Sequence, residues 1–353
     1  MDFGLSVEQR DLTDAERAWL GKHDPIGERR ADIDDGPATI SEALRAHVVE
    51  AGFAGMFTSE VAATNVDLLV LAEAHGWAGS PVPLAEMAIG ARLLEDLGHP
   101  RAESVAAGAD VAIPTYPGES MHLEVVEDRL RIVGTTAPAT GVIDADHVVV
   151  TAQLDDGRDI VAAIPVRDVE VRVLETLDLL RSWAVVEIDS HVEADDWTVL
   201  PSGEVGRVID QIATFRAVDA LGCADRLLGL SAEYAGQRTQ FGQPIGSFQA
   251  IKHHLANMVL AVEASRSVLW AAAVALDDDA DVASRSRAVS AAVAFVGRKA
   301  SEVAQSALQV HGGIGFTWEH DVHLLLRRIK VDELLDGVVS EHRRRLVALP
   351  ATA

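Results

Sequence analysis

The chain has 353 residues, of which 48% are hydrophobic and 24% charged, and its formal net charge at pH 7 is −25. This composition excludes a disordered chain, and the acidic charge disfavours binding to nucleic acid or to an anionic membrane surface. The single cysteine, Cys223, excludes an internal disulfide and any multi-cysteine metal site, and its apolar neighbours favour a buried packing role.

Helical periodicity dominates the first region, residues 1–108, which we predict to be an N-terminal helical domain. A charged amphipathic segment follows Ser6, and three further segments carry apolar residues at three- and four-residue spacing. These three segments are Ile40 to Gly52, Asn65 to Gly76 and Pro83 to Leu97. Glycine and proline breaks between them fit short helix connections.

Residues 109–200 change to short β-branched runs separated by Asp and Gly turns, which predict a small antiparallel β domain, sheet or barrel-like. The runs are His122 to Gly134 (two strands around a turn), His147 to Ala152, Asp159 to Val166, Val169 to Val173 and Trp183 to Ile188.

Long helices return in residues 201–353, and short links between them predict a C-terminal four-helix bundle. The four segments are Val208 to Gln237, Phe248 to Leu276, Ala283 to Val310 and His320 to Leu349. The expected fold class is therefore mostly α with a small β domain in the middle.

Targeting and metal signals are weak throughout. The N-terminal residues have neither the basic start nor the apolar core of a signal peptide, and no apolar stretch reaches the length of a membrane span. We therefore expect a cytoplasmic protein with no membrane span.

No third ligand accompanies the histidine pairs at workable spacing, and the aspartates from Asp277 to Asp281 do not continue as a calcium loop, so no metal site is expected.

Two motifs stand out in the last region. The first, Arg238-Thr-Gln-Phe-Gly-Gln-Pro-Ile-Gly-Ser-Phe-Gln249, lies between two predicted helices and combines a phosphate-binding guanidinium with glycines and two aromatic rings. The second, Gln309-Val-His-Gly-Gly-Ile-Gly-Phe-Thr317, places consecutive glycines after a helix, where a ligand could approach the backbone closely. Taken singly, each also fits an ordinary helix terminus followed by a turn.

In this order and separated by two helices, the motifs resemble those of the acyl-CoA dehydrogenase family over residues 208–337. The resemblance implies a helical domain, a small β domain and a four-helix bundle, assembled as a tetramer with each FAD held between two subunits. It implies contacts with the neighbouring subunit's FAD from Arg238, Gln240, Phe241, Ile245 and Phe248, and from Gln309, Gly312 and Gly313.

The same resemblance implies a catalytic carboxylate that removes the α-proton of an acyl-CoA thioester while a hydride passes to the flavin. Asp336 occupies the position of the family's glutamate, but its shorter side chain would hold the carboxylate about one methylene back. The family's other location for the base matches Ile212, which is not a carboxylate. The alternative interpretation is that Asp332, Glu333 and Asp336 form a solvated helix face.

The β region departs from the family pattern. The usual Thr-Glu-Pro and Gly-Ser-Asp segment shrinks to Thr115-Tyr-Pro-Gly-Glu-Ser, and no tryptophan stands in the segment Gly134 to Gly141, where a flavin-covering strand is expected. Such chains look like the short subunits of actinobacterial heteromeric acyl-CoA dehydrogenases, several of which act on sterol side-chain CoA thioesters. The segment Ser80 to Glu86 also resembles that subset.

Two functional hypotheses follow. In the first, the chain is a subunit of an FAD-dependent acyl-CoA dehydrogenase with Asp336 as the base, acting on a sterol side-chain or other bulky acyl-CoA. In the second, it is a catalytically silent FAD-binding and structural partner of a larger paralogous subunit. Both imply a homo- or hetero-tetramer and an acceptor like electron-transfer flavoprotein.

Overall fold

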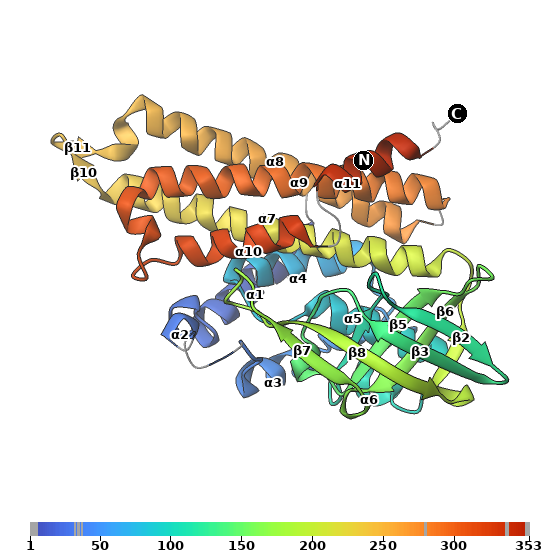
Figure 1. The fold of residues 1–353 in the computed structure, drawn as a ribbon. Coiled ribbons are helices and arrows are strands. Elements are labelled where there is room, and N and C mark those ends of the chain that lie inside the picture. The colour runs from blue at the N-terminus through green and yellow to red at the C-terminus, as the bar shows by residue number, and fades with distance from the viewer. Residues whose placement is uncertain are drawn as a thin grey trace.

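The computed structural model describes residues 6–31, 33, 36, 38–278, 281–335 and 339–349. Its elements run from helices through strands back to helices, as the sequence patterns predicted (Figure 1). The candidate base Asp336 lies outside the described residues, as do Asp279 and Ala280 of the acidic linker.

The N-terminal part consists of α1 (Val7–His23), α2 (Ile26–Ala31), α3 (Glu42–Glu50), α4 (Asn65–Ala78), α5 (Leu84–Leu97) and α6 (Ala102–Ala106). Capping boxes begin α1 at Ser6 and α4 at Thr64, where each hydroxyl accepts from the backbone N–H of the third helical residue. The short helix α2 was not predicted, since six residues carry too little periodicity to register.

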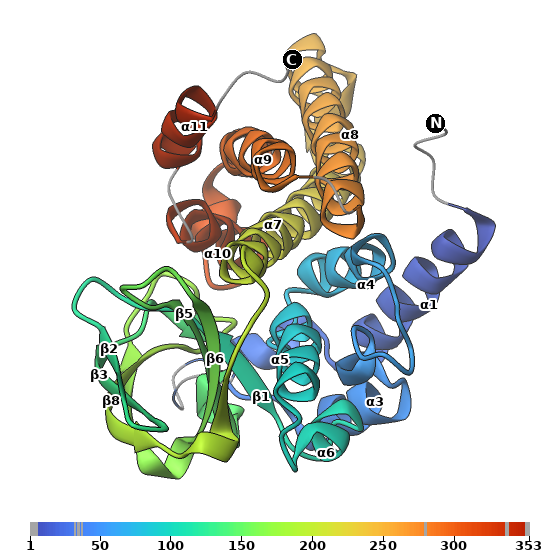
Figure 2. The same cartoon turned by 90° about the vertical axis from the view of Figure 1, so that its right-hand side faces the viewer.

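The middle part contains two sheets that face each other in a barrel-like arrangement (Figure 2). One sheet has the order β1-β5-β6-β9; the other has the order β2-β3-β8-β4, with β7 also paired to β8. The strands are β1 (Ala112–Thr115), β2 (His122–Val126), β3 (Arg129–Thr135), β4 (Ala139–Thr140), β5 (His147–Gln153), β6 (Asp159–Pro165), β7 (Glu170–Leu174), β8 (Trp183–Val192) and β9 (Trp197–Val199). The expectation of purely antiparallel pairing was wrong, because β1 and β5 pair in parallel.

The C-terminal part is built from α7 (Glu204–Gln237), α8 (Gln249–Asp277), α9 (Val282–His311), α10 (Val322–Leu334) and α11 (Val339–Ala348). The fourth predicted helix, from His320 to Leu349, is therefore two helices rather than one. The second of them, α11, is anchored to the bundle by Arg345, whose guanidinium lies 2.8 Å from Asp210 and donates to Ser286.

Helices α4 and α7 cross at very short range because each presents a glycine to the other. A Cβ atom added to Gly76 would lie 2.5 Å from the carbonyl oxygen of Asp219, and one added to Gly222 would lie 2.3 Å from the carbonyl oxygen of Glu73. Such distances exclude any side chain at either position without a shift of the helices. This contact fixes the N-terminal helices against the bundle.

Helix α8 is, among the helices that the structure describes, the one long and apolar enough to cross a membrane by length and composition. That finding corrects the expectation that no stretch reaches this length. Only 39% of its most apolar window is buried within the chain, and Leu260 is 68% exposed. α8 nevertheless packs against α7 and α9 as part of the bundle (Figure 2).

Candidate functional site

The first motif forms a β-hairpin that projects from one end of the bundle. Its strands, β10 (Thr239–Gln240) and β11 (Gln243–Pro244), pair antiparallel and are joined by Phe241 and Gly242. Both of these residues have positive φ angles, 51° and 81°. A two-residue turn with two positive φ angles normally carries Asn-Gly or Gly-Gly, because a bulky side chain is strained in the left-handed region.

Phe241 is thus kept at a position that is unfavourable for the backbone, and its ring is 93% exposed. Within the part of the chain that the structure describes, its one ring contact is edge-on, with Phe248 at a centroid distance of 6.2 Å. A strained, solvent-exposed aromatic residue contributes little to the stability of this chain by itself. Its placement is therefore better explained by contact with a molecule outside the chain.

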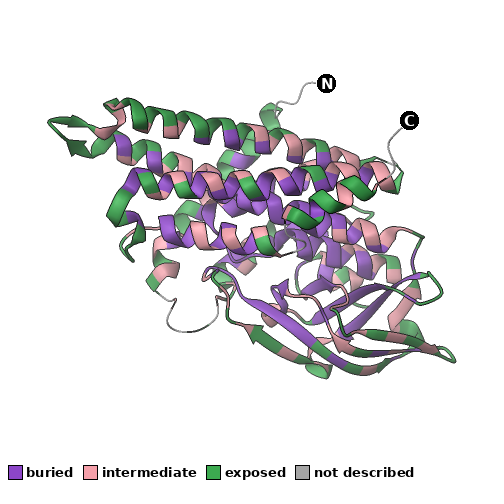
Figure 3. Ribbon diagram, turned by 45° about the horizontal axis from the view of Figure 1, so that its top comes forward, coloured by how far each residue is buried: buried purple, intermediate pink, exposed green. Residues whose placement is uncertain are grey.

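Arg238 and Gln240 are exposed, and the hairpin is coloured as exposed in Figure 3. Arg238 makes no ion pair with any described residue, and its carbonyl oxygen accepts from the backbone N–H of Ile245 at 2.8 Å. The hairpin backbone is thereby tied to Ile245 while the guanidinium stays available. A planar guanidinium without a partner is suited to bind phosphate oxygens in a bidentate manner.

The second motif lies where α9 ends. Gln309 is exposed, and Gly312 has φ 62° and ψ −140°, a conformation open only to glycine. A Cβ atom added to Gly312 or Gly313 would find no other atom within 4 Å. The glycine backbone therefore faces open space, and a ligand can approach it more closely than any side chain would permit.

Both motifs lie at the end of the bundle that points away from the sheets (Figure 1). Exposed aromatic residues gather in the same two segments, because Phe316 is 71% and Trp318 is 56% exposed in addition to Phe241. The fold thus places the two segments that the resemblance assigns to FAD at the same end of the bundle. It leaves them facing outward, so nothing in this chain's own sheets can share a ligand with them.

A long groove approaches this end between α8 and α9. Its volume is about 810 Å³, and its lining includes Leu260, Phe295, Lys299 and, at the motif end, Gln309. The sequence patterns did not indicate a groove.

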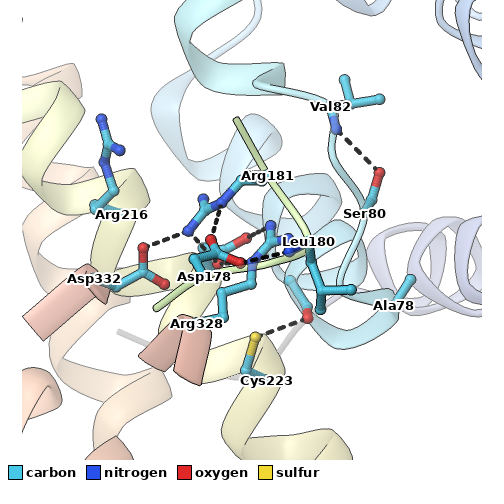
Figure 4. A network of polar contacts seen from close by, with 12 residues as sticks. Ala78, Ser80, Val82, Asp178, Leu180, Arg181, Arg216, Cys223, Arg328 and Asp332 are labelled. Carbon is cyan, nitrogen blue, oxygen red and sulfur yellow. Dashed lines mark hydrogen bonds and ion pairs between the residues drawn. The ribbon is translucent and has the colours of Figure 1, made fainter. Parts of the chain in front are cut away.

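A buried ionic network, also not foreseen, occupies the junction between the sheets, α4, α7 and α10 (Figure 4). Arg181, in the loop between β7 and β8, lies 3.0 Å from Asp178, 2.6 Å from Asp332 and 3.5 Å from Asp219. Arg328 donates to both carboxylate oxygens of Asp219, at 2.7 and 2.6 Å. The interpretation of Asp332 as part of a solvated helix face was therefore wrong. Glu333 is half-buried and accepts from Lys330 and Ser301.

Three carboxyl groups and two guanidinium groups meet in this network, so full ionisation would leave one negative charge that no guanidinium of the network neutralises. Burial raises the pKa of Asp332 well above its usual range. Arg181 lowers this pKa, but not enough to offset the loss of solvent and the repulsion from the adjacent Asp219 carboxylate. Burial also opposes ionisation of Asp219, but Arg181 and Arg328 outweigh it and hold its pKa well below the usual range. We infer that Asp332 keeps the proton and Asp219 is ionised.

Other candidates from the sequence lie apart from both regions. Ile212, at the family's alternative position for the base, is buried in the apolar core. Cys223 is fully buried with its sulfur 3.2 Å from the carbonyl oxygen of Gly76, and burial raises the pKa of its thiol well above the usual range. Among the described residues no group of three or more His, Cys, Asp or Glu side chains is arranged to hold a metal ion.

Comparison with known proteins gives one family match. Residues 209–349 match the family described as "Acyl-CoA dehydrogenase, C-terminal domain". The acyl-CoA dehydrogenase IpdE2 of Mycolicibacterium smegmatis is 38% identical over 146 residues, which cover 41% of this chain and 44% of that protein. The matched part thus spans less than half the length of that relative.

Solved structures resemble the whole chain. A chain of the ChsE4-ChsE5 complex from Mycobacterium tuberculosis superimposes with a TM-score of 0.88 at 24% identity, covering 99% of this chain and 100% of the other. A chain of the Tcur3481-Tcur3483 steroid ACAD, in its G363A variant, gives 0.84 at 23% identity with 97% of each chain covered. At these identities the similarity establishes the fold.

Proposed function

Because the chain carries an acyl-CoA dehydrogenase C-terminal domain and has the acyl-CoA dehydrogenase fold, we propose that it is a subunit of an FAD-dependent acyl-CoA dehydrogenase. In this proposal the enzyme introduces an α,β double bond into an acyl-CoA thioester. This chain supplies the hairpin Arg238–Phe248 and the segment Gln309–Gly313 to an FAD held mainly by a neighbouring subunit.

The observation that carries the proposal is the exposed hairpin. Phe241 stands in a left-handed conformation with its ring in solvent, beside an arginine that makes no ion pair among the described residues. The open backbone at Gly312 and Gly313 adds a surface that a diphosphate or an adenine could approach. These features fit an FAD that is shared between subunits.

When bound, FAD would supply the acceptor for a hydride from the substrate's β-carbon. This chain's residues would bind and orient it: Arg238 by pairing with a phosphate, Phe241 and Phe248 by apolar contact, and Gln309 by hydrogen bonding. Asp336 is the carboxylate at the position of the family's glutamate, and this sequence match is the support for assigning it the removal of the α-proton.

The proposed substrate class is a sterol side-chain or other bulky acyl-CoA. Its support is the structural similarity to a chain of the Tcur3481-Tcur3483 steroid ACAD. The visible spectrum of the flavinated complex tests it: a steroid side-chain CoA thioester should bleach the flavin band at a lower concentration than butyryl-CoA. Bleaching by butyryl-CoA alone would contradict this assignment.

The substitution Arg238→Ala tests the hairpin's role directly. A hydrogen bond to a charged group contributes about 1.5–3 kcal/mol, so its loss should raise the Kd for FAD roughly 10- to 150-fold. Arg167→Ala is the matched control, because Arg167 is an exposed arginine on the β domain with only a 3.8 Å ion pair to its neighbour Asp168. Equal FAD affinity in the two variants would refute the proposed role.

One observation favours the second hypothesis, a catalytically silent partner. The cavity between α4, the start of α5, α7 and the loop residue Arg181 has a volume of about 30 Å³. Sites for organic ligands usually occupy about 300–1,000 Å³. If the chain is silent, Asp336→Asn in the assembled enzyme leaves turnover unchanged, whereas a catalytic Asp336 makes turnover fall by orders of magnitude.

A further inference from the structure

His311 joins the two segments that the proposed function assigns to FAD. It is the last residue of α9, directly before Gly312, and only 3% of it is exposed. Its ring stacks on that of Tyr234 on α7, with a centroid distance of 4.7 Å and 22° between the ring planes. The carbonyl oxygen of Tyr234 accepts from the backbone N–H of Arg238, the first residue of the hairpin, at 2.8 Å. The stack therefore connects the end of α9 to the base of the hairpin.

Two further parts of the chain pack against the His311 side chain. The glycine segment after α9 forms the 3₁₀ turn η7 (Gly312–Phe316), and a Cβ atom added to its Gly315 would lie 3.2 Å from the Cβ atom of His311. His320, in the linker before α10, lies edge-on to the His311 ring at a centroid distance of 4.6 Å. Because the contacts are this close, the position of η7 depends on the position of this one side chain.

The hydrogen bonds of His311 require a neutral ring. Its Nδ1 atom lies 2.8 Å from the carbonyl oxygen of Ala307, which can only accept, so Nδ1 carries the proton. Its Nε2 atom is buried and has no hydrogen-bond partner in the part of the chain that the structure describes. Protonation would turn Nε2 into a second donor, buried and unpaired, on a ring with little access to solvent. Burial accordingly holds the pKa of His311 below its ordinary value.

His320 is held in the neutral form as well. Its Nδ1 atom accepts from the backbone N–H of Val322 at 3.3 Å, and a protonated Nδ1 could not accept. Burial also lowers the pKa of His320, and Asp321, which favours its charged form, is paired with Arg30 on α2 at 2.7 Å. The other charged and titratable side chains on the adjacent stretches of the chain are Glu233 and Tyr234 on α7, Glu319 in the linker, and His323 and Arg327 on α10. Since two protonated imidazoles at this distance would repel each other, acid disfavours the packed arrangement.

We propose that His311 is a positioning residue for FAD: its neutral ring keeps the hairpin and the glycine turn in register, and its protonation in mild acid releases the cofactor. This inference rests on the proposed function. Below the ordinary histidine value of about pH 6.5, a His311 that has left the stack takes up a proton, whereas the packed ring resists protonation. The packed arrangement is therefore favoured above this pH and loses population as the pH falls below it.

The affinity for FAD as a function of pH tests the proposal. The Kd for FAD of the assembled enzyme is measured by flavin fluorescence anisotropy between pH 8 and pH 5. We expect a constant Kd down to about pH 6.5 and a rise below it, by up to about tenfold per pH unit. A Kd that does not change with pH would overturn the inference. An assembly that binds no FAD even at pH 8 would refute the proposed function, and the inference with it.

Variants of His311 identify the titrating group. His311→Phe keeps an aromatic ring to stack on Tyr234 but cannot take up a proton, and His311→Gln is a second variant without a titratable ring. In both, the ratio of the Kd at pH 5 to the Kd at pH 8 should be close to 1, whatever the Kd at pH 8. If both variants fold, as verified by circular dichroism, and keep the wild-type ratio, His311 is not the group responsible.

The matched control is His147→Phe. His147 on β5 is also buried, burial also lowers its pKa, and it lies edge-on to His99. Its Nδ1 atom has no partner among the described residues, but it lies in the sheet region, away from the end of the bundle that carries the hairpin. This variant should keep the wild-type ratio of Kd values. A ratio near 1 here as well would show that the acid effect does not belong to His311.

His311→Ala tests the stack itself at pH 8, where the ring is neutral. Its Kd for FAD should exceed that of His311→Phe roughly 2- to 12-fold, which corresponds to the loss of one aromatic pair. Equal Kd values for the alanine and phenylalanine variants would contradict a positioning role for the ring.

Discussion

Two substitutions of aspartate by asparagine in the junction network should have opposite consequences. Asp219, which we infer to be ionised, accepts two hydrogen bonds from Arg328, whose side chain is almost completely buried. Asp219→Asn removes the charge and leaves that guanidinium buried without a carboxylate, which typically costs about 3–5 kcal/mol. Asp332→Asn replaces a carboxyl group that we infer to be protonated already, so it should cost less than about 1 kcal/mol at acidic pH.

The pH dependence of the free energy of unfolding distinguishes the two sites further. The folded pKa of Asp332 is raised, so the folded protein holds a proton that the unfolded chain releases above about pH 4. Wild-type stability therefore falls as pH rises above that value, by up to about 1.4 kcal/mol per pH unit from this group. Asp219 has a lowered folded pKa, so its contribution is present at neutral pH and is lost only in acid.

Urea unfolding followed by circular dichroism, at one protein concentration and between pH 5 and 8, measures both effects. The midpoint of Asp219→Asn should lie well below that of the wild type at pH 7. The midpoint of Asp332→Asn should rise relative to the wild type as pH increases. If the two variants lose equal stability at pH 7, Asp332 is ionised and the assignment of the proton is wrong.

Three further predictions concern the hairpin, the helix crossing and the candidate base. Replacing Phe241 by glycine relieves the strain of its left-handed backbone. The variant should therefore be more stable to urea by up to about 1 kcal/mol and should bind FAD more weakly. A variant that loses stability would refute the strain argument. Gly222→Ala should destabilise the chain by about 1–3 kcal/mol or more, because the added methyl group overpacks against α4. Gly229→Ala on the same helix should stabilise the chain by up to about 1 kcal/mol, because its added Cβ atom would meet no other atom within 4 Å. Thermal unfolding compares these two glycine variants, and similar shifts would contradict the close crossing. Asp336→Asn in the assembled enzyme separates the two hypotheses in a steady-state assay with an acyl-CoA: unchanged turnover is expected of a silent partner, and a loss by orders of magnitude is expected of a catalytic Asp336.

Local patterns predicted much of this fold. Periodicity placed α4, α5, α8 and α9 within a few residues of their observed ends, and β-branched runs found β2, β3, β5, β6, β7 and β8. The missed elements are short: β1 has four residues, β4 has two and β9 has three. Runs of this length carry no readable alternation, and their pairing is set by neighbours distant in sequence.

Residues with distant partners could not be assigned from sequence. Asp332 looked like an exposed helix residue because its neighbours are charged, but its partner Arg181 lies 151 positions away. The hairpin was different, since Arg238 to Phe248 is contiguous and its glycines and aromatics are visible in one segment. Chemistry contained in one segment was thus foreseeable, whereas the buried ionic network depends on three segments that only the fold brings together.

The most direct test of the account is the visible absorption spectrum of this chain, recorded first alone and then in complex with its partner chain. We expect no flavin band from the purified chain, and a flavin band in the complex that an acyl-CoA thioester bleaches. A chain that carries FAD alone and bleaches with acyl-CoA would contradict the account, because it would hold a complete site without a partner.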